Sequence, residues 1–116
     1  GENFYFQLLS NTEVKQDQIQ AEQAQIDLAN GALLIDVREP SERAESGYIA
    51  GSLSVPLAQV AQELPRIAPD RDQELIFYCA SGSRSQTALE TAQELGYTRV
   101  YNLGALSDWP YGITHD

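Results

Sequence analysis

The stretch LIFYCASGSRS, residues 75–85, decides the fold of this chain. Its first four residues form an apolar run that ends at Cys79, and such a run is typical of a buried parallel strand. The small and apolar residues after Arg84 recur at helical spacing as far as Gly96, so we predict a helix that begins near Arg84. Cys79 is therefore expected at the carboxyl end of a strand, where a tight loop leads into a helix.

Further strands and helices are expected to alternate on both sides of this unit. The expected strands are residues 33–37, 53–55 and 99–101. The first expected helix lies within residues 10–30. A capping box of Ser10 and Glu13 can open it, a start several residues later is also open, and Gly31 closes it. The other expected helices are a short one within residues 39–45, residues 57–64 before Pro65, and a last turn or helix at residues 104–109. This alternation predicts a small α/β domain, with a largely parallel sheet covered by helices on both faces.

The length and the composition exclude several classes of protein. A chain of 116 residues is typical of one domain. It contains no apolar run of the roughly 20 residues that span a bilayer, so we expect no membrane partner. The formal net charge of -10 argues against a nucleic-acid partner, because a protein needs a basic face to bind a phosphate backbone. Any small anion must therefore be bound by a local arrangement of backbone N–H groups and an arginine.

Cys79 is the only cysteine, so it cannot form an intramolecular disulfide or belong to a multi-cysteine zinc site. The only histidine, His115, is the penultimate residue, and we expect neither a Cys/His catalytic pair nor a histidine metal site. Two interpretations of Cys79 remain, a buried small apolar residue and a reactive thiol. The polar, glycine-containing loop that follows favours the reactive thiol.

The loop after Cys79 is suited to binding negative charge. Its small side chains let the backbone curl tightly, and Gly82 can adopt the positive φ that such a curl often requires. The free N–H groups at the start of the next helix and the Arg84 guanidinium add positive charge. We therefore predict that the pKa of Cys79 lies below about 8.5, the value of a free cysteine.

Four segments of the chain, taken together and in this order, match the motifs of a known protein family. They are LIDVREP at residues 34–40 with Glu42 after it, GYIAGS at 47–52 leading to Val55 and Pro56, the loop at 79–85, and NLG at 102–104 with Trp109. On the basis of these four segments, the chain resembles a single-domain rhodanese over about residues 24–109. Residues 1–7 look like the remnant of an expression tag, so the domain is expected to span residues 8–116. Tyr48, Ala50 and Ala105 depart from the family pattern in scaffold loops.

The resemblance implies a two-step sulfur transfer that requires no metal or organic cofactor. The Cys79 thiolate would take a sulfane sulfur from a small anionic donor such as thiosulfate. The Cys79 persulfide would then pass it to cyanide or to a thiol, including a thiol on a protein. The matching substrate-binding residues are Ala80, Ser81, Gly82, Ser83, Arg84 and Ser85, with Arg84 as the anion contact. Asp36 and Arg38 would lie near the site, either as supporting functional residues or as a purely structural polar cluster.

Two other functions remain open. Cysteine phosphatases and arsenate reductases also hold a thiolate among N–H groups and an arginine, but their loops are one residue longer and commonly place a His where this chain has Tyr78. A persulfide carrier or regulatory rhodanese-like module would use the same Cys79 chemistry for one protein partner. The composition predicts a soluble protein. The sequence leaves the compartment open between the cytoplasm and the bacterial periplasm, because a tag at residues 1–7 can replace a native signal peptide.

Overall fold

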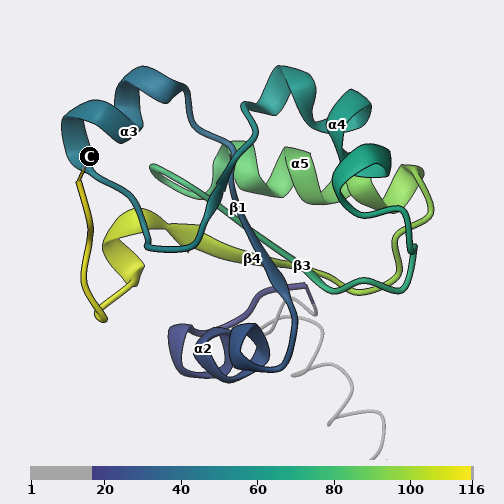
Figure 1. The fold of residues 1–116 in the computed structure, drawn as a ribbon, viewed down its shortest axis with the longest axis horizontal. Coiled ribbons are helices and arrows are strands. Elements are labelled where there is room, and N and C mark those ends of the chain that lie inside the picture. Colours follow the sequence, from purple (N-terminus) through teal and green to yellow (C-terminus); the bar gives the residue numbers. More distant parts are fainter. Residues whose placement is uncertain (1–16, 116) are drawn as a thin grey trace, which may run out of the picture.

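The computed structural model describes residues 17–115, which form a four-stranded parallel sheet in the order β2-β1-β3-β4 (Figure 1). The strands are β1 (Leu33–Asp36), β2 (Leu53–Ser54), β3 (Leu75–Cys79) and β4 (Val100–Ala105). All five residues of β3 are buried, as expected for an inner strand covered on both faces. The tag-like residues 1–7 and the predicted capping box of Ser10 and Glu13 lie outside the described residues.

Helices cover both faces of the sheet, which confirms the predicted fold class. They are α2 (Ala21–Ala29), α3 (Pro40–Ser46), α4 (Val60–Ile67) and α5 (Ser83–Glu94). Figure 1 shows α2 on one face of the sheet and α4 with α5 on the other. Alternate residues of β3 enter the two cores, because successive strand side chains point to opposite faces: Phe77 and Cys79 face α4 and α5, whereas Ile76 and Tyr78 face α2.

The prediction that Pro65 ends its helix is wrong. A 3₁₀ turn at Leu57–Gln59 leads into α4, and α4 continues past Pro65 to Ile67. A proline inside a helix removes one N–H donor and crowds the carbonyl four residues before it, so the helix continues only where packing compensates. Leu64 and Ala68 are both buried, and the Ala68 N–H donates to the Leu64 carbonyl at 2.8 Å. Tertiary packing therefore outweighs the local preference of the proline.

The last strand is longer than predicted, because pairing with β3 extends it to Ala105. Gly104 and Ala105 pair with Tyr78 and Cys79 after a register shift. Only Leu106–Asp108 remains for the expected last turn, and it is a 3₁₀ helix. Within residues 17–115, no helix has the length and apolar character needed to cross a membrane.

Candidate functional site

Cys79 is the last residue of β3, and the loop after it turns directly into α5. Gly82 stands at the N-cap of α5 with φ +100° and ψ -14°, in the left-handed region that a side chain would disfavour. The helix begins at Ser83, one residue before the position near which it was predicted to start. The sequence-based expectation of a positive φ at Gly82 is thus confirmed.

The loop folds around the sulfur atom of Cys79. The Gly82 N–H donates to Sγ at 3.0 Å, and the Ser85 N–H donates to Sγ at 3.4 Å. The Ser85 Oγ also lies 3.4 Å from Sγ. Cys79 is fully buried, yet its sulfur meets polar donors rather than only the apolar core. This is the arrangement predicted for a cradle that holds negative charge.

These contacts lower the pKa of Cys79. Burial raises it and is the largest single influence, because desolvation disfavours the thiolate. Hydrogen bonds from the Ser85 side chain and from the N–H groups of Ser85, Ser81 and Gly82 together outweigh burial, so the net pKa lies below the ordinary value. The thiolate, which is the nucleophilic form of cysteine, is favoured as predicted.

Replacing Ser85 with alanine should raise the pKa of Cys79, because it removes a hydroxyl that lies 3.4 Å from the sulfur and helps to lower this pKa, while the burial stays in place. We expect alkylation by iodoacetamide near neutral pH to slow roughly fivefold to tenfold, in proportion to the lost thiolate. The measurement is the alkylation rate as a function of pH. Ser83→Ala, at an exposed serine of the same loop, is the matched control. If the curve of alkylation rate against pH had the same inflection point in Ser85→Ala as in the wild type, the prediction would be wrong.

Arg84 does not stand alone above the loop. Its Nη1 and Nη2 donate to the two carboxylate oxygens of Glu42 at 2.7 Å and 2.9 Å, which forms a two-point ion pair between α5 and α3. Hydrogen bonding from Arg84 lowers the pKa of Glu42 to about 2. The predicted anion contact is therefore already occupied by a carboxylate. Glu42 belongs to the motif quoted above, but the sequence assigned it no partner.

Asp36 and Arg38 form a buried cluster. Asp36 accepts hydrogen bonds from the backbone N–H and the guanidinium of Arg38, from Arg43 and from the Tyr78 hydroxyl, and none of the bonds described for it reaches Cys79. Burial raises the pKa of Asp36. Hydrogen bonds and nearby positive charge, chiefly from Arg38, outweigh burial, so the net pKa is lowered. Tyr78 precedes Cys79 in β3 and points to the opposite face. The contacts thus favour the structural interpretation of Asp36 and Arg38.

Asn102 connects the loop to β4, a contact that sequence reasoning missed. Its Oδ1 lies 2.7 Å from the Ser85 Oγ and accepts from the Gly104 N–H at 2.9 Å. Its Nδ2 donates to the Gly82 carbonyl at 3.2 Å and to Gln86 at 3.1 Å. The available signal was a polar residue directly after the predicted strand at residues 99–101, at the start of the NLG segment. Asn102 thereby fixes both residues that donate to the sulfur.

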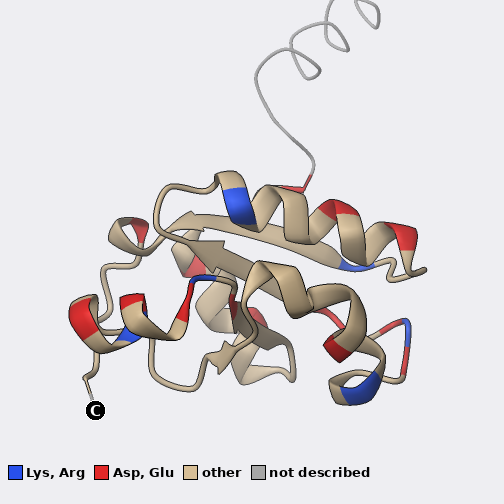
Figure 2. Ribbon diagram, turned by 90° about the horizontal axis from the view of Figure 1, so that it is seen from above, with Lys and Arg blue, Asp and Glu red and all other residues tan. Residues whose placement is uncertain are grey.

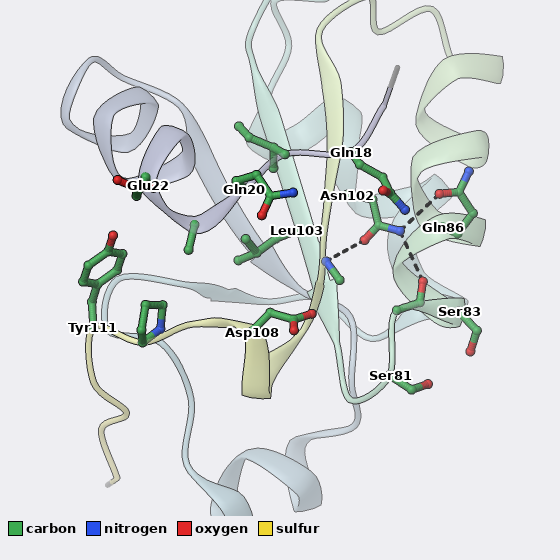
Figure 3. Close-up of a pocket in the computed structure, with 15 residues that line it drawn as sticks. Gln18, Gln20, Glu22, Ser81, Ser83, Gln86, Asn102, Leu103, Asp108 and Tyr111 are labelled. Atoms are coloured by element: carbon green, nitrogen blue, oxygen red, sulfur yellow. Dashed lines mark hydrogen bonds between the residues drawn. The ribbon is translucent and has the colours of Figure 1, made fainter. Parts of the chain in front are cut away.

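A groove of about 720 Å³ adjoins the outer side of the loop (Figure 3). Ser81 and Ser83 form part of its wall, and Gln18, Gln86 and Asn102 contribute amide groups. Its described lining residues do not include Cys79. Asp and Glu lie on several helices and loops around the molecule, with basic residues scattered among them (Figure 2). Attraction of an anion to the site therefore depends on the loop after Cys79 and not on the electrostatic field of the whole protein.

Comparison with known proteins matches residues 13–110 to the rhodanese-like domain family. The chain is 36% identical over 74 residues to the thiosulfate sulfurtransferase PspE of Escherichia coli K12, covering 64% of this chain and 70% of that protein. It is 33% identical over 99 residues to the human thiosulfate:glutathione sulfurtransferase, covering 71% and 83%. It is 42% identical over 79 residues to the uncharacterized protein YqhL of Bacillus subtilis, where the match spans 67% of this chain and only 60% of the relative.

Solved structures give the same result for the fold. A rhodanese with anions from E. coli matches with a TM-score of 0.69 at 30% identity, covering 73% of this chain and 99% of that one. The human single-domain sulfurtransferase TSTD1 matches with a TM-score of 0.73 at 27% identity, covering 86% and 100%.

Proposed function

This chain belongs to the rhodanese-like domain family, and from that premise we propose that it transfers a sulfane sulfur from an anionic donor such as thiosulfate to a thiophilic acceptor, through a persulfide on Cys79. The observation that carries the proposal is the convergence of the Gly82 and Ser85 N–H groups on the Cys79 sulfur. Two relatives that are 36% and 33% identical over the aligned residues are named thiosulfate sulfurtransferase and thiosulfate:glutathione sulfurtransferase, which supports sulfurtransferase activity.

In the first step, the Cys79 thiolate attacks the outer sulfur of thiosulfate. A new S–S bond forms to Cys79, the S–S bond of thiosulfate breaks, and sulfite leaves with the electron pair. The cradle then holds the terminal sulfur of the persulfide, which is anionic. In the second step, the acceptor attacks this terminal sulfur and the Cys79 thiolate leaves. Cyanide becomes thiocyanate, and a thiolate becomes a persulfide.

The loop supports sulfur transfer better than phosphate chemistry. Only four residues separate Cys79 from Arg84, and the Gly82 N–H already lies 3.0 Å from Sγ. A loop closed this tightly around one atom suits a single added sulfur. The loops of cysteine phosphatases and arsenate reductases are one residue longer, which leaves room for a whole tetrahedral oxyanion.

A thiol acceptor is the natural extension of this proposal, because two relatives are named thiosulfate:glutathione sulfurtransferases. A carrier that serves one protein partner would form the same persulfide but would not turn over with small acceptors. Steady-state transfer from thiosulfate to cyanide separates the two functions. Stoichiometric persulfide without turnover would favour the carrier.

Treatment with thiosulfate is expected to add one sulfur atom to the protein. Intact-mass spectrometry should show this addition, fragmentation should locate it on Cys79, and dithiothreitol should remove it. The matched control is protein whose thiol has first been alkylated, which should gain nothing. A protein that stays unmodified in thiosulfate while its thiol reacts normally with iodoacetamide would overturn the persulfide proposal.

A further inference from the structure

The start of α5 is an unfavourable place for a lone cation. Arg84 is the second residue of this helix, where the positive end of the helix dipole repels a guanidinium. The two hydrogen bonds to Glu42 compensate for that repulsion and hold the guanidinium in one orientation. Arg84 and Glu42 are each about one-third exposed, so the pair lies at the surface of the site. An incoming anion would therefore interact with the charges of both side chains.

Glu42 is itself fixed from a second direction. Its Oε1 accepts a hydrogen bond from the Glu39 N–H at 3.0 Å, which is one half of the capping box that opens α3. The carboxylate is therefore held at the start of α3 and cannot move aside without the loss of that cap. The pKa of Arg84 is raised, chiefly by its hydrogen bonds to Glu42, and negative charge on Cys79 makes a smaller contribution in the same direction.

We propose that Glu42 determines the donor specificity of this site, because it neutralises Arg84 in a two-point ion pair and leaves the backbone amides of the loop as the main attraction for the donor. The inference rests on the proposed sulfurtransferase function and specifies its donor class. An unpaired guanidinium would attract an anion in proportion to the anion's charge, and pairing with Glu42 removes most of that attraction. Because of the ion pair, the site favours dianionic donors such as thiosulfate less strongly over monoanionic donors such as methanethiosulfonate than an unpaired Arg84 would.

The test is Glu42→Gln, which keeps a residue that can complete the capping box but removes the negative charge. We expect KM to fall about threefold for the monoanion methanethiosulfonate and about tenfold for the dianion thiosulfate, since the Coulomb energy scales with the donor's charge. High salt should reduce both changes through screening. Glu45→Gln, at an exposed glutamate of the same helix, is the control for net charge.

A double-mutant cycle with Arg84 tests the pairing directly. Arg84→Ala leaves Glu42 as an uncompensated carboxylate, so KM for thiosulfate should rise more than KM for methanethiosulfonate. Adding Glu42→Gln to Arg84→Ala should return KM most of the way to the wild-type value. A double variant as impaired as Arg84→Ala would show that Arg84 acts without Glu42, and it would overturn the proposal.

Binding of sulfate provides a readout that does not need turnover. Sulfate should protect Cys79 from iodoacetamide more strongly in Glu42→Gln than in the wild type. If thiosulfate formed no persulfide but this protection still increased, the proposed function would fail and the charge role of Glu42 would stand. If Glu42→Gln changed only the melting temperature, with KM and sulfate protection unaltered, Glu42 would be a helix cap and the inference would be wrong.

Discussion

Replacing Cys79 with serine is expected to abolish sulfur transfer completely. A serine hydroxyl stays protonated at neutral pH and cannot form the persulfide that both steps require, whereas the cradle around it is retained. The fold should tolerate the change, because the Gly82 and Ser85 N–H groups can donate to oxygen as they do to sulfur. The measurement is thiocyanate formed from thiosulfate and cyanide in the steady state.

The control for this variant is its thermal unfolding, which should remain cooperative and close to that of the wild type. A cooperative transition is required because an unfolded variant would lose activity whatever the role of Cys79. Transfer above the uncatalysed background in folded Cys79→Ser protein would contradict the assignment of Cys79 as the nucleophile.

Replacing Asn102 with alanine is expected to have the second-largest effect. Asn102 is 6% exposed, and its side chain makes hydrogen bonds to Ser85, Gly82, Gln86 and Gly104. Its loss leaves buried polar groups unsatisfied, which should lower the free energy of unfolding by about 1–3 kcal/mol. It also releases both donors that face the sulfur, so kcat/KM should fall roughly 10-fold to 100-fold as the thiolate becomes less favoured.

The decisive readout for Asn102 is the pH dependence of Cys79 alkylation, which should move to higher pH in Asn102→Ala. A residue that only stabilised the fold would lower the melting temperature and leave this profile in place, and that outcome would refute a positioning role. Asn30→Ala is a matched control, because Asn30 is exposed and its side-chain amide donates locally to the Ile26 carbonyl at the end of α2. We expect it to leave the alkylation profile unchanged.

Parts of the fold were predictable because they depend on neighbours in sequence. The apolar run of β3, the tight loop and the helical spacing of α5 are local patterns, and the structure has all three where they were expected. The errors occurred where distant contacts decide the outcome. Packing of Leu64 and Ala68 carries α4 past Pro65, and pairing with β3 extends β4 to Ala105.

The same division holds at the candidate site. The residue types and spacing from Cys79 to Ser85 determined by themselves that a thiol would stand in a ring of donors, since backbone curvature and helix polarity are local properties. Only the tertiary structure decided that Arg84 pairs with Glu42, 42 residues away in sequence, and that Asn102 of another strand holds the loop closed. Such partners are set by how the elements pack, and a single sequence contains no local pattern that encodes which distant charges and amides will meet.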